Sequence, residues 1–226
     1  MAYNNEKFRI IEFNGTPGCG KTTVVRSLAE KLICKTKYNY YRNRIDKNAY
    51  SLLLNPKYYP LLKQVFKYAN LYPQKKELLR CLLPAVFIRK YNNFLQDDST
   101  SLLLFDQGFI QSIISLAHTD NLIVSPLLES IIDTSGLNNL PIFIVNCKCD
   151  IDVSIARIKG RPDNGARVHD MKNEKLYTTI KTQMDNFFCF RDIIKEKCPN
   201  VKTMDMDTNL DVSENVDLLI KQMSIG

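Results

Sequence analysis

A chain of 226 residues, of which 45% are hydrophobic and 24% charged, can bury a full core as one compact unit, and we expect a single domain over residues 1–226. The first residues lack the basic and apolar regions of a signal peptide, and no apolar run could span a bilayer, so we expect a cytoplasmic protein that does not enter a membrane. Seven cysteines, an odd number, favour free thiols over a disulfide framework.

The net charge of +7 is unevenly distributed along the chain. Residues 31–95 hold fourteen Lys and Arg but only two acids, together with nine of the eleven tyrosines. Such a segment is typical of a site for an anionic substrate, of a nucleic-acid-binding surface or of a solvated helical surface. Its composition alone leaves these alternatives open.

The first predicted elements are a strand, a glycine-rich loop and a helix. Residues 8–13 form a short apolar run rich in strand-forming side chains, and residues 22–34 carry apolar side chains at helical spacing. The loop between them has the pattern of a P-loop, with Gly15, Thr16, Pro17, Gly18, Cys19, Gly20, Lys21 and Thr22 in succession.

The chemistry of this loop is nucleotide binding. Glycines let backbone N–H groups curl around phosphate oxygens, and the following helix directs its N-terminal dipole at the same anion. Lys21 would reach the β- and γ-phosphates, and Thr22 would offer its hydroxyl to Mg²⁺. The sequence therefore predicts that the loop, with the adjoining Thr23, binds ATP together with Mg²⁺.

The next predicted strand spans residues 38–44, and residues 52–96 indicate several helices separated by four prolines at 56, 60, 73 and 84. An apolar strand at 101–105 then ends in Asp106. A carboxylate there lies at the edge of the sheet where ligands bind, so Asp106 could hold Mg²⁺, orient an acceptor or take its proton. The structural alternative is an N-cap for a helix that starts at Phe109.

The remaining pattern alternates helices and strands. We expect helices at 109–117, 125–133, 150–159, 171–197 and 212–223, and strands at 141–146 and 201–206. Cys147 and Cys149 are predicted to end a buried strand, because their spacing does not suit a zinc knuckle. This alternation predicts an α/β fold in which a doubly wound parallel sheet has helices on both faces.

Three arginines surround a polar loop. Arg157 and Arg161 lie four residues apart at the end of a helix, and Arg167 follows across the loop. Arginines on a closing lid, here residues 157–170, would stabilise the charge that spreads over a transferred phosphoryl group. The alternative is that Arg157 and Arg161 complement the dipole at the helix end.

The P-loop, the strand that ends in Asp106 and the Arg-Ile-Lys-Gly-Arg motif at 157–161 together resemble the nucleoside monophosphate kinase superfamily, and within it the thymidylate-kinase-like branch. The resemblance covers most of the chain. It implies a five-stranded P-loop fold with a helical acceptor-binding insertion at 38–96 and a short lid. It also implies that the turn at 207–209 borders the adenine.

The sequence departs from this family after Asp106. Thymidylate kinases commonly have an arginine at the next position and deoxynucleoside kinases show Glu-Arg there, whereas this chain has Gln107 and Gly108. Arg42 or Arg44 would then supply the positive charge for an acceptor phosphate.

The leading hypothesis is an ATP- and Mg²⁺-dependent kinase for a nucleotide, a nucleoside or another hydroxyl-bearing acceptor, with Lys21, Asp106, Arg157 and Arg161 as catalytic residues. A nucleotide-hydrolysing switch is the second hypothesis, with Gln107 positioned to orient water. A nucleic-acid-binding protein ranks third, because the prolines and apolar helices of the basic segment indicate packed structure. The sequence leaves a homodimer open.

Overall fold

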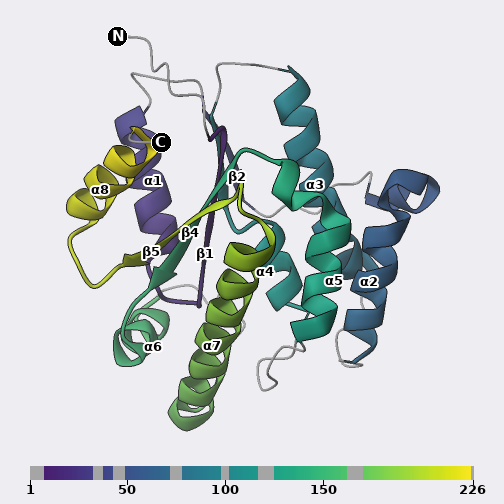
Figure 1. Cartoon of the computed structure of the whole chain (residues 1–226). Helices are drawn as coiled ribbons and strands as arrows, with labels where there is room; N and C mark the ends of the chain where they lie inside the picture. Colours follow the sequence, from purple (N-terminus) through teal and green to yellow (C-terminus); the bar gives the residue numbers. More distant parts are fainter. Residues whose placement is uncertain are drawn as a thin grey trace.

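The computed structural model describes residues 8–32, 38–42, 49–71, 78–97, 102–116, 125–161 and 170–224 (Figure 1). Within these ranges the chain forms a parallel sheet with strand order β2-β3-β1-β4-β5. The strands are β1 (Ile10–Gly15), β2 (Tyr38–Arg42), β3 (Leu102–Asp106), β4 (Ile142–Lys148) and β5 (Lys202–Asp207). The parallel α/β arrangement predicted from the alternating pattern is confirmed.

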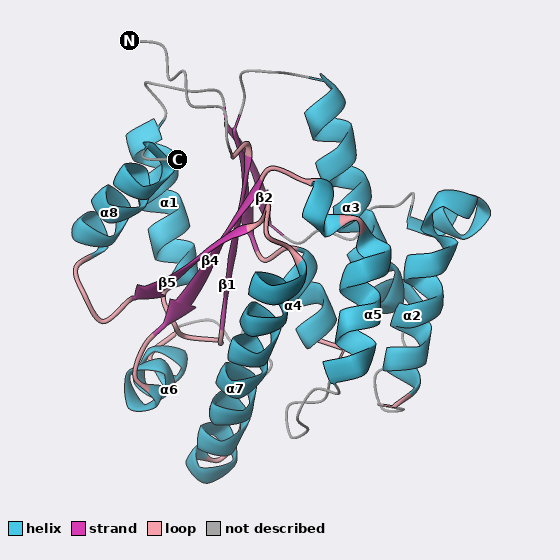
Figure 2. Ribbon diagram, viewed as in Figure 1, coloured by secondary structure: helices cyan, strands magenta, loops and turns pink. Residues whose placement is uncertain are grey.

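Helices cover both faces of this sheet (Figure 2). The α-helices are α1 (Lys21–Leu32), α2 (Tyr59–Asn70), α3 (Leu78–Asp97), α4 (Phe109–Ile114), α5 (Ser125–Ser135), α6 (Ile151–Lys159), α7 (Asn173–Lys197) and α8 (Val212–Ser224). Three short 3₁₀ helices, η1 (Ala49–Leu54), η2 (Pro56–Tyr58) and η4 (Leu137–Asn139), complete the described elements. Helices α1 and α8 pack on one face, whereas α3, α4, α5 and α7 lie on the other.

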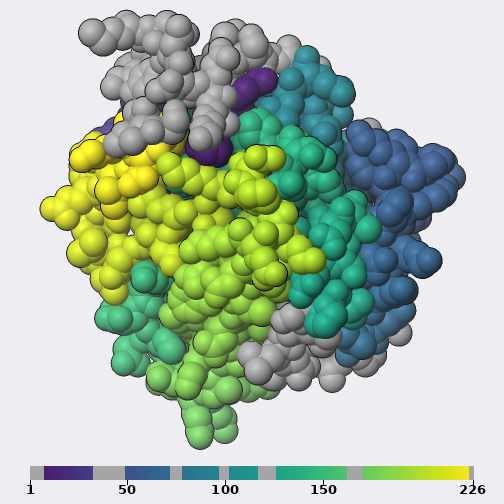
Figure 3. Space-filling view, in the orientation of Figure 1, coloured from purple at the N-terminus to yellow at the C-terminus, as the bar shows by residue number. Residues whose placement is uncertain are grey.

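The layer of helices that contains α5 and α7 is visible on the outer surface. Figure 3 shows α7 running across the molecule with α5 beside it, and the two helices are in contact. Among the described helices, none is both long enough and apolar enough to cross a membrane.

The strands alternate between two cores, and this alternation decides where the polar side chains point. On β1, Ile11 and Phe13 pack against the α1 and α8 side, whereas Ile10 packs with α3, α4 and Phe105 on the opposite side. Phe13 and Phe105 are fully buried, and each contributes about 1.5–3 kcal/mol relative to an exposed ring. Glu12 therefore faces the α3 and α4 side.

The insertion between β2 and β3 contains η1, η2, α2 and α3, so the prediction of several helices is confirmed. Pro60 lies in the first turn of α2, where a missing N–H costs nothing. Pro84, however, lies inside α3, and the prediction that it separates two helices is wrong. A proline in a helix interior costs about 3 kcal/mol, which is offset here by the burial of Leu82, Ala85 and Val86 beside it.

Several boundaries differ from the expected ones. β1 starts and ends two residues later than predicted, and α4 ends at Ile114, where helix was expected to continue to 117. β4 extends to Lys148, so Cys147 is a buried strand residue and Cys149 follows the strand end, as the sequence predicted.

Candidate active site

The P-loop octet lies between β1 and α1, as predicted. Gly15 has no room for a side chain, because a Cβ there would lie 2.4 Å from the carbonyl oxygen of Cys147 on β4. Gly20 has a φ of +89°, a conformation that glycine adopts readily and other residues avoid. These two positions let the loop pack tightly on the sheet and turn into α1.

Lys21 lies over the loop that precedes it. Its Nζ donates hydrogen bonds to the carbonyl oxygens of Gly15 at 3.2 Å and Thr16 at 3.4 Å. The residue is only 8% exposed, although it carries a charge. Both bonds are long and their acceptors are neutral, so a phosphate at the loop would be a better partner for this ammonium group.

Thr22 and Asp106 meet although they are 84 residues apart. The Thr22 hydroxyl donates a hydrogen bond of 2.6 Å to Oδ2 of Asp106. Asp106 pairs with Phe13 across β1 and β3, so its side chain points to the α1 side of the sheet. A hydroxyl beside a buried carboxylate forms a hard oxygen donor set, which suits Mg²⁺.

The alternative reading of Asp106 as a helix N-cap is wrong. The N-cap of α4 is Gly108, which makes no side-chain capping bond. The residue between them, Gln107, has a φ of +91°, and it is the non-glycine residue with a positive φ in the described part of the chain. Such a conformation is uncommon for a residue with a Cβ, and it is held here because the Gln107 N–H bonds to the carbonyl oxygen of Phe13 at 3.2 Å.

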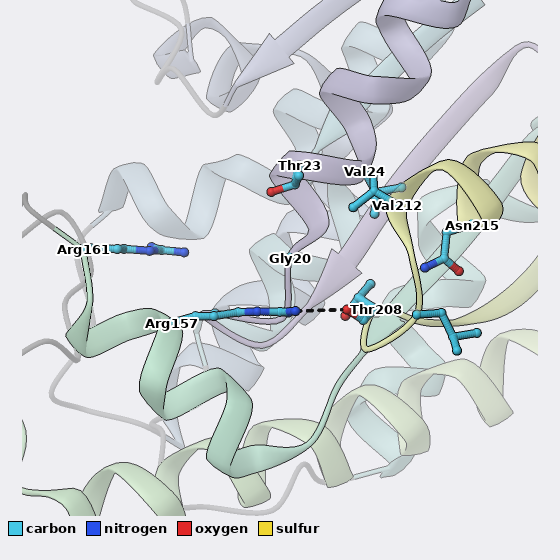
Figure 4. Close-up of a pocket in the computed structure, with 10 residues that line it drawn as sticks. Gly20, Thr23, Val24, Arg157, Arg161, Thr208, Val212 and Asn215 are labelled. Carbon is cyan, nitrogen blue, oxygen red and sulfur yellow. Dashed lines mark hydrogen bonds between the residues drawn. The ribbon is translucent and has the colours of Figure 1, made fainter.

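A pocket of about 410 Å³ opens beside the P-loop (Figure 4). It is bounded by the P-loop and α1, by α6 and by the turn that follows β5. The residues that line it are Gly18, Gly20, Thr23, Val24, Arg157, Arg161, Thr208, Leu210, Val212 and Asn215. The turn at 207–209, which the family resemblance implied to border adenine, therefore contributes Thr208 to a pocket that adjoins the phosphate loop.

Arg157 contacts this turn directly. Its Nη2 donates a hydrogen bond of 3.1 Å to the carbonyl oxygen of Thr208, and Figure 4 shows both Arg157 and Arg161 extending from the α6 side. Arg157 thus links the end of α6 to the turn that follows β5. Arg167 and residues 162–169 of the predicted lid lie outside the described residues, as does Arg44.

The family resemblance included Thr208 in the turn at 207–209 but gave its side chain no role of its own. Its hydroxyl lies within hydrogen-bonding distance of the carbonyl oxygen of Cys19 in the P-loop and is 2.9 Å from that of Lys148 on β4. The side chain therefore connects the phosphate loop to the pocket wall. A lone threonine after the last strand carries no sequence signal for this role.

The thiol of Cys19 and that of Cys147 are packed beneath the loop. Burial raises the pKa of both thiols above the ordinary value. They therefore stay protonated at neutral pH and act as small apolar groups that support the loop.

No protein-family profile matches the sequence, and none of the curated proteins matches it. Solved structures do match. A deoxyadenosine kinase from M. mycoides with bound dATP superposes with a TM-score of 0.53 and 18% identity over 95% of this chain and 98% of that chain. The chain has the fold of the P-loop kinases.

Two further structures give the same result. The M. mycoides deoxyadenosine kinase with the products dCMP and a flexible dCDP gives a TM-score of 0.54 and 16% identity, over 96% of this chain and 100% of that chain. The YorR protein from Bacillus subtilis, in complex with phosphorylated GDP, gives 0.50 and 13%, over 96% of each chain. The α/β fold with a parallel sheet and helices on both faces, which the resemblance implied, is confirmed.

Proposed function

We propose that this protein is an ATP- and Mg²⁺-dependent kinase that transfers the γ-phosphoryl group to a hydroxyl-bearing acceptor of the nucleoside or nucleotide class. The observation that carries the proposal is the hydrogen bond between Thr22 and Asp106, which joins the P-loop helix to the end of β3 next to Lys21 and the pocket. Phosphoryl transfer needs positioning and charge stabilisation more than covalent chemistry, and this cluster offers both.

On the donor side, the pocket beside Thr208 would receive the base and ribose of ATP, and its volume of about 410 Å³ is in the range of small-ligand sites. The phosphates would follow the loop amides to Lys21, whose ammonium group would exchange two carbonyl oxygens for phosphate oxygens. Thr22 and Asp106 would hold Mg²⁺, which neutralises phosphate charge when it is bound.

On the acceptor side, a hydroxyl oxygen of a nucleoside or a phosphate oxygen of a nucleoside monophosphate forms a bond to the γ-phosphorus, and the bond between that phosphorus and the bridging oxygen of ADP breaks. Where the acceptor is a hydroxyl, Asp106 would receive the proton that it loses. Arg161, with Arg167 from the predicted lid, would stabilise the charge on the transferred group, and Arg157 would have to turn from the carbonyl oxygen of Thr208 toward the phosphates to share this role.

The insertion at 38–96 would bind the acceptor. Arg42 at the end of β2 pairs in register with Asp106, so its backbone lies at the same edge of the sheet as the carboxylate. The strong excess of basic residues in 31–95 favours an acceptor that is anionic. The similarity to a deoxyadenosine kinase, which is a likeness of fold, supports the nucleoside or nucleotide class.

The proposal is tested by measuring ADP release from ATP and Mg²⁺ in the presence of nucleosides, deoxynucleosides and their monophosphates, one at a time. One class should raise the rate well above that without acceptor, and the phosphorylated acceptor should accumulate in equal amount. ADP release that no acceptor changes would instead favour the nucleotide-hydrolysing switch. Binding of an oligonucleotide with a steep salt dependence, without ADP release, would favour the nucleic-acid hypothesis.

A further inference from the structure

A buried pair of polar side chains, Glu12 and Tyr91, lies on the opposite side of the sheet from Thr22. Both residues are 0% exposed. Glu12 belongs to β1 and Tyr91 to α3, and the Tyr91 hydroxyl donates a hydrogen bond of 2.7 Å to Oε2 of Glu12. Burial raises the pKa of Glu12, so this carboxyl group costs stability where an apolar residue would pack freely.

The pair holds the first amides of α4. The N–H of Ile110 donates to Oε1 of Glu12 at 2.8 Å, and the N–H of Phe109 donates to the Tyr91 hydroxyl at 3.1 Å. In these bonds each side-chain oxygen of Glu12 acts as an acceptor, and the Tyr91 hydroxyl both donates and accepts. Glu12 and Tyr91 supply the capping bonds that Gly108 cannot make.

The backbone of the preceding turn touches the same pair. A Cβ at Gly108 would lie 2.5 Å from Cδ of Glu12 and 2.5 Å from the Tyr91 hydroxyl oxygen, so only glycine fits there. One residue earlier, the N–H of Gln107 is bonded to β1. The chain that leaves Asp106 is thus held by β1 at Gln107 and by the Glu12–Tyr91 pair over the next three residues.

The pair cannot reach the reacting groups itself. Side chains alternate along β1 and β3, so Glu12 points to the α3 and α4 side whereas Asp106 points to α1. Any effect of the pair on Asp106 must pass through the backbone of the turn. Glu12 and Tyr91 are therefore candidates for positioning rather than for catalysis.

Tyr91 comes from α3, which is part of the insertion assigned above to the acceptor. We propose that Glu12 and Tyr91 are positioning residues that couple this insertion to the Asp106 carboxylate, so that the strained turn presents Asp106 correctly only when α3 is in place. The inference rests on the proposed function, because it concerns the acceptor side of the same site. A nucleotide or nucleoside acceptor that shifts α3 would change the geometry at Asp106 through this pair.

The principal test is Tyr91→Phe in the full chain, assayed with ATP, Mg²⁺ and the acceptor found in the screen. We expect kcat to fall at least about tenfold while the Kd for ATP changes less than about twofold, because the P-loop is untouched. Hydrogen exchange at the amides of Phe109 and Ile110 should become faster.

Ser135→Ala is the matched control for lost stability. The Ser135 hydroxyl is also buried, accepts a bond from the N–H of Leu137 at 3.0 Å and donates to the carbonyl oxygen of Ile132 at 2.7 Å. The control should lose a comparable amount of stability and keep its kcat. If Tyr91→Phe behaves like Ser135→Ala, with lower thermal stability and an unchanged kcat, the pair is structural and the inference is overturned.

A second series uses Glu12. Glu12→Gln keeps an oxygen that accepts from the Ile110 N–H but places an amide NH₂ where the Tyr91 hydroxyl now donates, whereas Glu12→Leu removes both groups, so the Gln variant should retain more of kcat than the Leu variant. Equal kcat values for the folded Gln and Leu variants would contradict positioning. A wild-type protein that phosphorylates no acceptor would reject the proposed function, whereas an active wild type with a fully active Tyr91→Phe variant would reject only this inference.

Discussion

Lys21→Ala should remove nucleotide binding without weakening the free protein. In the free protein, the lost interactions are two long hydrogen bonds to neutral carbonyl oxygens, at 3.2 and 3.4 Å, worth at most about 1 kcal/mol each. Their loss is offset because a charge that is only 8% exposed no longer has to be desolvated. In the ATP complex, two charge-assisted bonds to phosphate are lost, at about 1.5–3 kcal/mol each.

A loss of about 3–6 kcal/mol corresponds to an affinity for ATP that is roughly 10²–10⁴ times weaker. At ATP and Mg²⁺ concentrations about 100 times the wild-type Kd, the ligand should stabilise the wild type by about 2.7 kcal/mol, and the variant by less than about 0.4 kcal/mol. For a chain of this length, that is a rise in Tm of about 5–11 °C for the wild type and under about 2 °C for the variant. Differential scanning fluorimetry and isothermal titration calorimetry measure both quantities.

Lys31→Ala is the matched control on the same helix. Lys31 forms a surface ion pair with Asp217 at 2.8 Å and lies at the other end of α1 from the loop. Its removal should change stability by less than about 1 kcal/mol and leave the Kd for ATP unchanged. An ATP affinity of Lys21→Ala equal to that of the wild type, in titrations where the control is also normal, would refute the assignment of the P-loop as the nucleotide site.

Further predictions concern Asp106, the predicted lid, the acceptor and Glu12. Asp106→Asn should lower kcat far more than it weakens ATP binding, and steady-state kinetics with a near-normal kcat would reduce Asp106 to a structural residue. Arg161→Ala should lower kcat, and hydrogen exchange of the amides that follow Arg161 should slow when ATP and acceptor bind; ligand-independent exchange contradicts the lid. Changing Arg42 and Arg44 together to glutamine should raise the KM for an anionic acceptor, whereas an unchanged KM indicates a neutral acceptor. In the wild type, the affinity for an anionic acceptor should fall as the salt concentration rises, because salt screens exposed charges. Because burial raises the pKa of Glu12, its contribution to stability is fully present below the unfolded pKa and is lost as pH rises through the folded pKa. Denaturant unfolding at pH values between the unfolded and the folded pKa of Glu12 should show a free energy of unfolding that falls as pH rises in the wild type. Glu12→Gln should remove this dependence.

The sequence by itself determined the P-loop, the order of the elements and the helical insertion. Each of these depends on local patterns, namely glycine spacing, apolar runs of strand length and helical periodicity, which neighbours along the chain impose. The same local reasoning misjudged Pro84, because the burial that keeps α3 continuous comes from other helices and from the sheet.

Asp106 shows where the sequence pattern stops and the assembled sheet decides. Its place at the end of an apolar strand favoured a side chain at the ligand edge of the sheet, with an N-cap of the helix that starts at Phe109 as the alternative. The choice depended on the parallel pairing of β3 with β1, which turns the carboxylate toward Thr22. Strand register is a property of the assembled sheet, so one strand's sequence cannot decide it.

Only the tertiary structure revealed the hydrogen bonds of Thr208 and the Glu12–Tyr91 pair. Thr208 bonds the P-loop from 189 residues away, and Tyr91 bonds Glu12 from 79 residues away. The sequence around Glu12 predicts only a strand and that around Tyr91 only a helix. Neither indicates the hydrogen bond, because each partner is contributed by a distant segment. Local pattern thus determined which elements form, whereas the packing of helices on both faces of the sheet decided which polar groups meet beneath the site.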